Sequence, residues 1–430
     1  MRRGSTRGPR LSGDASARTD DLATRYRAVR ALTEALRAPL SAEDCQAQSM
    51  EDASPAKWHL AHTTWFFETF VLEPGWAGYQ PFRPQFRVLF NSYYQQVGPQ
   101  YPRPRRGLLT RPGLDEVLAY RAHVDRHVLE LLARGNGRGE PLAAVVELGL
   151  HHEQQHQELL LTDAKHLLAS SPLRPAYAAA APAQRGASVP LRWQGFAGGL
   201  REIGHDGGGF AFDNERPRHA VALAPFKLAT RLVTNGELLA FIEDGGYERA
   251  DLWLSDGWIA VQSRGWCAPL YWERRDGAWW QFTLAGMQPL AADEPVCHVS
   301  LYEADAYASW AGARLATEVE WEVAAAAQRV DGNLLDSGRL HPQPAPRLEG
   351  VQQLFGDAWE WTRSAYAPYP GYRPPAGALG EYNGKFMVNQ LVLRGGSCAT
   401  PASHIRPTYR NFFPPDSRWQ FSGIRLAKDS

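Results

Sequence analysis

Apolar residues recur at intervals of three and four along most of the first 170 positions, and this is the spacing that places side chains on one face of an α-helix. The segments that carry the pattern are residues 22–40, 54–72, 114–134 and 141–169. Ser54 and Pro55 open the second segment, and we interpret them as an N-cap residue followed by proline at the first helical position. Four such helices in succession predict an up-and-down bundle.

The pattern changes after about residue 188, where Gly, Trp and turn residues separate short apolar runs. A helical period returns clearly only at residues 300–327, so we expect an irregular α+β domain with little regular sheet. Residues 170–187 are rich in Ala and Pro, which is typical of a linker. The expected organisation is a disordered leader at 1–19, a helical bundle at 20–169, this linker at 170–187 and a second domain at 188–430.

The connection between the second and third predicted helices is unusually long and covers residues 82–112. Loops of this length in a compact domain are usually functional or disordered. This one contains many aromatic residues, which argues against disorder. We therefore expect it to contribute to a functional site.

Charge and cysteine content narrow the function classes. Lys+Arg and Asp+Glu balance at 46 each, so no basic field favours nucleic acid or an anionic membrane, and a small-molecule partner is expected. No apolar run approaches the ~20 residues of a membrane span. The cysteines Cys45, Cys267, Cys297 and Cys398 are scattered without a CxxC pair, which argues against a disulfide framework and favours a reducing cytoplasm.

The run HHEQQHQE at residues 151–158 is the strongest chemical signal. His152 and His156 are four residues apart and share one helix face, and Gln155 lies within ~60° of His152 around the helix axis. The Leu-rich surroundings predict that this face points inward, where polar groups need partners. Satisfied core histidines and a metal site both remain possible, because His123 and His127 show the same spacing.

A second helix offers His59 and His62, and one of them can face the first pair across the bundle. Three neutral imidazoles suit Fe, Zn or Cu, so zinc hydrolysis and iron oxygenation are both open on this ground. The run also matches the HExxH pattern of zinc proteases, with Glu153 as the base. We interpret that match as coincidental, because such proteases rarely use this bundle context.

Several long runs resemble, in order, the iron-dependent sulfoxide synthases of ergothioneine biosynthesis, the hercynine oxygenases, and the resemblance spans residues 20–428. The runs that carry it are residues 49–72, 148–163, 312–322, 356–362, 393–401 and 409–427. The resemblance implies an all-α part followed by an α+β part: a DinB-like four-helix bundle, then a formylglycine-generating-enzyme-like domain related to the C-type lectin fold.

The same resemblance implies an Fe(II) site of the form H…HxxxHxE. Its ligands match His62, His152 and His156 in this sequence, and Glu158 matches an outer-shell residue. The glutamine that contacts the substrate imidazole in the family matches Gln155.

The implied substrate is hercynine, the trimethylated betaine of histidine, whose quaternary ammonium is held by aromatic faces. An Asn-aromatic pair that contacts the betaine in relatives matches Asn411 and Phe412. Phe413 stands where some relatives carry an acidic residue that holds γ-glutamylcysteine, which puts that donor in doubt. Arg83 and Arg87 are candidates for binding a substrate carboxylate, with solvated arginines as the alternative.

Tyr93 and Tyr94, in the long connection, resemble the branch of the family that accepts free cysteine. A phenol near the iron can deliver a proton during the oxygen chemistry, and its loss is expected to divert the thiolate to over-oxidation. The alternative is that both rings only anchor the loop.

The sequence is therefore expected to encode a non-haem Fe(II), O2-dependent enzyme that joins a thiol donor, cysteine first, to C2 of the hercynine imidazole and gives a sulfoxide. The expected partners are hercynine, the donor and O2, without nucleic acid or membrane. Two alternatives remain: a selenoneine synthase that joins a selenosugar to hercynine, and a lectin-like binding module without catalysis. Formylglycine synthesis is disfavoured, because Cys297 and Cys398 show no matching copper-binding arrangement.

Overall fold

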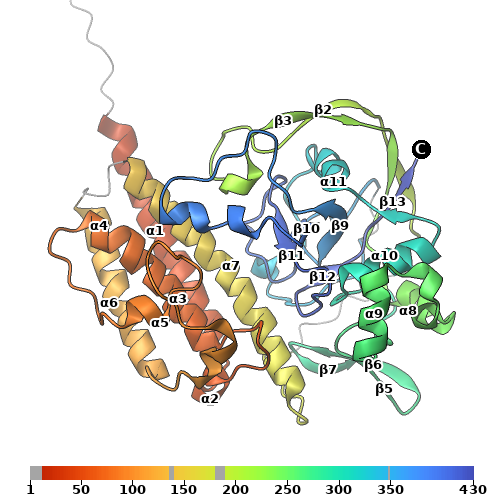
Figure 1. Ribbon diagram of the computed structural model, residues 1–430, viewed down its shortest axis with the longest axis horizontal. Helices are drawn as coiled ribbons and strands as arrows, with labels where there is room; N and C mark the ends of the chain where they lie inside the picture. Colours follow the sequence, from red (N-terminus) through yellow and green to blue (C-terminus); the bar gives the residue numbers. More distant parts are fainter. Residues whose placement is uncertain (1–11, 135–139, 180–188, 347–348) are drawn as a thin grey trace, which may run out of the picture.

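The computed structural model describes residues 12–134, 140–179, 189–346 and 349–430. Four long helices form a bundle on one side of a second, mixed domain, and the fourth helix runs between the two (Figure 1). These helices are α1 (Ser12–Arg37), α3 (Ala56–Phe67), α6 (Leu114–Ala133) and α7 (Glu140–Ser170). The bundle predicted from the helical period is therefore present.

Helices α3 and α7 pack closely along their apolar faces. Gly149 of α7 allows this approach, because an added Cβ would lie 2.5 Å from the ring of Phe67. The buried side chains around it are mostly aromatic and aliphatic, including Trp65 and Phe66. This contact fixes the spacing between the two helices that carry the histidine motifs.

The helix starts differ from the predicted ones. Pro55, rather than Ser54, is the N-cap of α3, and no side chain caps this end. Ser54 is used by tertiary contacts: its N–H donates to Asp163 at 2.8 Å and its hydroxyl accepts from Arg106 at 2.9 Å. Helix α1 begins at Ser12, inside the expected leader 1–19, and residues 1–11 of that leader lie outside the described residues.

The long connection at residues 82–112 is ordered and packed against the bundle, as its aromatic content predicts. Phe86, Phe90 and Tyr94 in it are buried. The connection contains two short elements, α5 (Phe86–Leu89) and η2 (Arg103–Leu108). Just before it lie η1 (Glu68–Leu72) and α4 (Glu73–Gly75), and α2 (Ala42–Gln46) lies between α1 and α3. Of these, η1 is a π-helical continuation of α3.

The second domain contains more regular sheet than the sequence predicts. One four-stranded sheet has the order β1 (Trp193–Phe196), β4 (Phe226–Ala229), β13 (Leu426–Asp429), β8 (Arg314–Leu315). The other has the order β11 (Asn411–Phe413), β10 (Leu391–Arg394), β9 (Trp359–Ala365), β12 (Ser422–Gly423). Strands β2 (Gly199–Ile203) and β3 (His219–Leu223) form a pair, and β5 (Trp272–Arg275), β6 (Ala278–Thr283) and β7 (Gly286–Pro289) form a three-stranded sheet.

The single helix expected at 300–327 is two helices, α10 (Leu301–Trp310) and α11 (Glu318–Ala325). Gly312, with φ +61°, stops the first, and β8 then pairs with β13 before Thr317 caps the second. Sheet pairing therefore interrupts a continuous helical period. The remaining elements are α8 (Asn235–Glu243), α9 (Ser255–Arg264) and the 3-10 turns η4 (Asp213–Glu215), η5 (Gly246–Glu248), η6 (Ala250–Leu252), η7 (Leu335–Ser337), η8 (Ala378–Glu381) and η9 (Gly384–Phe386).

The start of the expected linker is packed rather than free. Tyr177 is buried, and its hydroxyl donates to the carbonyl of Leu36 in the bundle. Its backbone N–H donates to the carbonyl of Leu284 in the second domain at 2.8 Å. Residues 180–187 of that linker lie outside the described residues.

Among the residues that the structure describes, no helix is both long enough and apolar enough to span a bilayer.

Glu153 of α7 holds a buried charge cluster in the bundle. Its carboxylate accepts from Arg30 at 2.8 Å, from Arg121 at 2.5 Å and from Thr33 at 2.6 Å. Burial raises the pKa of this carboxyl, but the guanidinium groups of Arg121 and Arg30 outweigh burial and bring the pKa down to about 2. The carboxylate is therefore ionised and paired at neutral pH.

We predict that Glu153→Gln lowers the free energy of unfolding by about 3–5 kcal/mol, because it removes the buried carboxylate that Arg30 and Arg121 share and leaves them only the more exposed carboxylates of Asp125 and Glu34. Glu147→Gln is the matched control on the same helix, since Glu147 pairs with Arg25 at the surface, and it should cost at most ~1 kcal/mol. Denaturant unfolding at neutral pH measures both. Equal losses in the two variants would contradict the prediction.

The pKa of Glu153 also determines how its contribution to the free energy of unfolding depends on pH. Because the folded-state pKa of about 2 lies below the usual 4.5, the contribution of Glu153 is complete above the usual value and declines as the pH falls toward 2. The stability difference between wild type and Glu153→Gln should therefore shrink across this window.

Candidate metal centre

Three buried histidines from two helices converge at the junction of the bundle and the second domain. His62 comes from α3, and His152 and His156 come from α7. One potential ligand atom from each lies within 4.8 Å of the other two. The helical period placed the α7 pair on one inward face, and the close packing of α3 brings the third imidazole to it.

The ring of His62 is fixed in one orientation. Its Nδ1 lies 2.6 Å from the carbonyl oxygen of Phe90, which can only accept, so Nδ1 carries the proton. Its Nε2 is then a bare lone pair and lies 3.2 Å from Nε2 of His152. Trp58 stacks on the His62 ring at a centroid distance of 4.6 Å and holds its plane.

These imidazoles are neutral. Burial lowers the pKa of all three, to about 3 for His152, and mutual repulsion lowers the pKa of His62 and His156 further. A neutral imidazole is the form that ligates a metal. Nδ1 of His152 is also buried without a hydrogen-bond partner among the described residues. The donor set therefore fits a first-row divalent metal such as Fe(II), Zn(II) or Cu(II).

His59 is not a member of this group. Its Nδ1 lies 2.9 Å from Nδ1 of His156. This contact occupies Nδ1 of His156 and leaves its Nε2 for the group of three. Its Nε2 lies 3.0 Å from Asp163. Of the two candidates on the second predicted helix, the structure thus brings His62 into the group and places His59 behind His156.

The HExxH match does not supply a base to this centre. Glu153 points into the bundle, where Arg30 and Arg121 neutralise it. Glu153 lies ~100° from His152 around the helix axis, and its carboxylate is taken up by Arg30, Arg121 and Thr33. The interpretation of this match as coincidental agrees with the geometry.

Gln155 lies at the contact with the second domain. Its Nε2 donates to the Tyr409 hydroxyl at 2.6 Å, and its Oε1 accepts from the Tyr382 hydroxyl. The Tyr382 ring stands edge-on to His152 at a centroid distance of 5.5 Å. These two tyrosines were not predicted. Tyr382 lies in the run 378–388 and Tyr409 at the start of the run 409–427, and no spacing pattern in either run marks them as site residues.

Tyr93 and Tyr94 stack on each other, with ring centroids 4.6 Å apart and an interplanar angle of 30°. Tyr94 is fully buried against Trp65, and Tyr93 packs edge-on against Phe386. Burial raises the pKa of both phenols, and the phenols of Tyr93 and Tyr382 raise that of Tyr94 further. Both side chains therefore keep their protons at neutral pH. Tyr93 meets η9 through Phe386, whereas Tyr94 packs against Trp65 and Phe70 of the bundle.

The residues expected to hold the betaine lie on β11, where alternate side chains face opposite sides. Phe412 stacks on Tyr366 at 4.0 Å and lies 6.1 Å from Phe386, which in turn contacts Tyr93. Phe413 faces the other way and packs against Trp419. The strand therefore places Phe412 and Phe413 among different partners. Asn411 shares the Phe413 face, and its Oδ1 accepts from the N–H of Phe412 at 3.0 Å.

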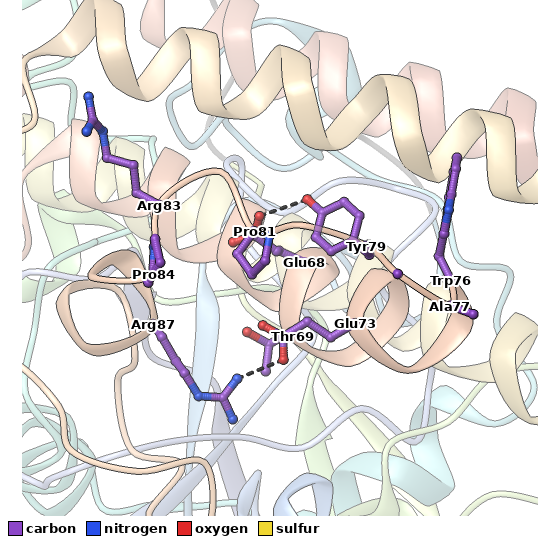
Figure 2. Close-up of a pocket in the computed structure, with 11 residues that line it drawn as sticks. Glu68, Thr69, Glu73, Trp76, Ala77, Tyr79, Pro81, Arg83, Pro84 and Arg87 are labelled. Carbon is purple, nitrogen blue, oxygen red and sulfur yellow. Dashed lines mark hydrogen bonds and ion pairs between the residues drawn. The ribbon is translucent and has the colours of Figure 1, made fainter.

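Arg83 and Arg87 lie elsewhere. They line a cavity of about 400 Å³ on the outer part of the bundle, together with Glu73 and Trp76 (Figure 2). Arg83 pairs with Glu116, and Arg87 pairs with Glu73 at 2.8 Å. Both cations already have carboxylate partners, and none of the three histidines lines this cavity. The structure therefore gives no support to their expected role toward a substrate carboxylate.

Glu158 joins the two domains rather than supporting the histidines. Its carboxylate accepts from Trp359 at 2.8 Å, from Thr400 at 2.6 Å and from Ser397, all in the second domain. Burial raises the pKa of this carboxyl, and these three hydrogen bonds lower it again in part. Glu158 was expected to be an outer-shell residue of the metal site, and in the structure its carboxylate is a contact between the two domains.

Comparison with known proteins gives the same two-part division. Residues 25–160 match the DinB superfamily, and residues 195–347 and 344–430 match the sulfatase-modifying factor enzyme 1-like domain. The hercynine oxygenase of Mycobacterium tuberculosis is 34% identical over 402 residues, which cover 87% of this chain and 91% of that protein. The formylglycine-generating enzyme of Streptomyces coelicolor is 30% identical over 52% of this chain and 84% of its own length. Ergothioneine biosynthesis protein 1 of Schizosaccharomyces pombe is 30% identical over 51% of this chain and 28% of its own length.

We predict that replacing His62, His152 or His156 with Ala removes tight binding of one divalent metal per chain, because each change deletes one of three converging donors. His127→Ala is the control, since its Nδ1 is bonded to the carbonyl of His123 in its own helix. Metal content after oxygen-free loading with Fe(II) measures this. Loss of metal in His127→Ala together with retention in His62→Ala would show that the ligand assignment is wrong.

Proposed function

Because this chain belongs to the hercynine oxygenase family, we propose that it is an Fe(II)- and O2-dependent enzyme that joins a thiol to C2 of the hercynine imidazole and gives a sulfoxide. The observation that carries the proposal is the convergence of His62, His152 and His156 beside Gln155. Three neutral imidazoles leave other coordination positions of a bound metal open. When bound, Fe(II) would supply dioxygen activation and a binding point for the donor thiolate.

The proposed conversion balances without an external reductant. The C2–H bond of hercynine and the S–H bond of the donor break, and a C2–S bond and an S=O bond form. The two hydrogens leave with the second oxygen atom of O2 as water. The protein therefore has to position two substrates and manage protons, and a reducing cofactor is not part of the proposal.

Gln155 is suited to hold the substrate imidazole. Tyr409 and Tyr382 occupy its amide nitrogen and one lone pair of its oxygen, which fixes the amide plane. The second lone pair of Oε1 can accept an imidazole N–H. Both tyrosines come from the second domain, so docking of the domains would orient this contact.

Aromatic faces are the natural partners of a trimethylammonium group, which cannot donate a hydrogen bond. Phe412 belongs to a continuous aromatic group that runs through Phe386 to Tyr93. This group supports Phe412 as the betaine contact. Phe413 points away from it and is better explained by its packing on Trp419.

The protonated phenols of Tyr93 and Tyr94 support a role in proton delivery. The two rings stack on each other, and the Tyr94 hydroxyl makes no hydrogen bond to another described residue, so its proton is available to a substrate. We propose cysteine as the donor, and a selenosugar is the alternative. The four cysteine thiols of the chain are unpaired, which supports a reducing compartment such as the cytoplasm.

The betaine contact predicts that hercynine is strongly preferred over histidine. Phe412→Ala should weaken hercynine binding by about 0.5–2 kcal/mol, because one aromatic face is lost. Phe413→Ala is the matched neighbour on the opposite strand face and should change hercynine binding little. Calorimetric titration of the metal-loaded protein under oxygen-free conditions measures both. Equal turnover of histidine and hercynine would exclude this assignment.

The tyrosine pair predicts a change in product rather than in metal content. Removing the proton-donating phenol in Tyr93→Phe or Tyr94→Phe should divert the donor thiol toward its sulfinic acid, which also consumes one O2 per thiol. Iron content should stay normal, because neither phenol is proposed as a ligand. Product analysis with hercynine and each of cysteine, γ-glutamylcysteine and a selenosugar measures this and identifies the donor.

Wild-type product ratios in both variants would show that the tyrosines only pack. Coupling of the selenosugar alone by the wild type would make the protein a selenoneine synthase. A protein that binds no metal and couples no donor would instead favour the lectin-like binding module.

A further inference from the structure

A hydrogen-bonded chain leads from His156 away from the other two histidines. Nδ1 of His156 lies 2.9 Å from Nδ1 of His59, and Nε2 of His59 lies 3.0 Å from Oδ2 of Asp163. His156 and Asp163 are seven residues apart on α7, so two helical turns bring them to the same face, and His59 reaches them from α3. All three side chains are buried.

The proton positions along this chain follow from the acceptor at its end. An ionised carboxylate can only accept, so His59 must present Nε2–H to Asp163. A neutral His59 then has a bare Nδ1, which accepts the Nδ1–H of His156. Nε2 of His156 is left as a bare lone pair, the form that a metal requires. One carboxylate thus sets the tautomer of an imidazole that it does not touch.

Asp163 is itself anchored. Its Oδ2 also accepts the backbone N–H of Ser54 at 2.8 Å, at the point where the chain enters α3. The carboxylate therefore stays where His59 needs it. The diversion of Ser54 from a helix cap to this bond links the start of α3 to the ligand set.

The three histidines are supported unequally. The Phe90 carbonyl orients His62, whereas Nδ1 of His152 has no partner among the described residues. His156 alone is backed by a side-chain relay that ends in a charge. Metal-ligating histidines commonly donate their second N–H to such a group, and its loss typically costs 10–100-fold in metal affinity.

We propose that His59 and Asp163 are positioning residues that hold His156 in its metal-binding tautomer. The inference rests on the proposed function, because it concerns a metal at the three-histidine centre. It assigns a role to the histidine of the second helix that is not a ligand.

The test compares His59→Phe with His59→Gln. Phenylalanine fills the space of the imidazole without an acceptor, whereas glutamine offers Oε1 to the Nδ1–H of His156. The affinity for Co(II), measured by chelator competition without substrate, should fall about 10–100-fold in His59→Phe and should be largely restored in His59→Gln. Asp163→Leu should also lose affinity, because it removes the acceptor of the His59 Nε2–H, and the proton of His59 can then sit on Nδ1 and reverse the relay.

His166→Phe is the matched control, since His166 is another α7 histidine with a side-chain partner, Ser49, outside the centre. Its Co(II) affinity should equal that of the wild type. Nitrogen-15 NMR of metal-free protein adds a readout that simple packing would not move. The His156 ring should be protonated at Nδ1 in the wild type and in His59→Gln, and its tautomer should shift toward Nε2–H in Asp163→Leu.

Unchanged Co(II) affinity in both His59→Phe and Asp163→Leu would overturn the inference while leaving the proposed function intact. Absence of Co(II) and Fe(II) binding in the wild type would instead refute the proposed function. If His59→Phe fails to fold, the comparison of His59→Gln, Asp163→Leu and wild type decides: affinity unchanged in Asp163→Leu overturns the inference, and affinity lost there but kept in His59→Gln supports it.

Discussion

Helix α7 buries eight consecutive polar side chains, residues 151–158, wholly or in large part. An unpaired polar group in a protein interior is costly, so a helix of this composition is stable only where every face meets a partner. The bundle and the second domain together supply those partners. The position of α7 between the two halves of the molecule follows from this requirement (Figure 1).

The partners sort by helix face. Glu153 and Gln157 point into the bundle, where Glu153 meets two arginines and Gln157 bonds to α1. His151, Gln154, Gln155 and Glu158 bond to side chains of the second domain, namely His404, Ser403, Tyr409 and Ser397. His152 and His156 lie between these two groups and turn toward His62 on α3. The candidate metal centre is therefore the part of this stretch where three buried imidazoles face one another.

Burial also determines which groups in and around the centre carry protons. The imidazoles are held neutral by desolvation, and the phenols around them are held protonated by the same effect. Nitrogen lone pairs are thus available on one side and O–H groups on the other. Both depend on the second domain covering α7, because exposure to water would remove the desolvation that sets each pKa.

The sequence by itself determined the helical bundle and the inward face of His152, Gln155 and His156, because helical period depends only on local spacing. It also determined the family, because several long runs match in order. Tertiary structure alone decided that Gly312 and strand pairing split residues 300–327 into two helices. It also decided that the Ser54 N–H donates to Asp163, whereas the sequence predicts a helix cap. The ion pairs of Arg83 and Arg87 with Glu116 and Glu73, outside the histidine centre, likewise come from tertiary structure. It also separated His62 from His59, and Phe412 from Phe413, which residue type cannot do. The reason is the same in each case: a local pattern fixes which way a side chain points, but the partner that it meets there comes from residues tens to hundreds of positions away.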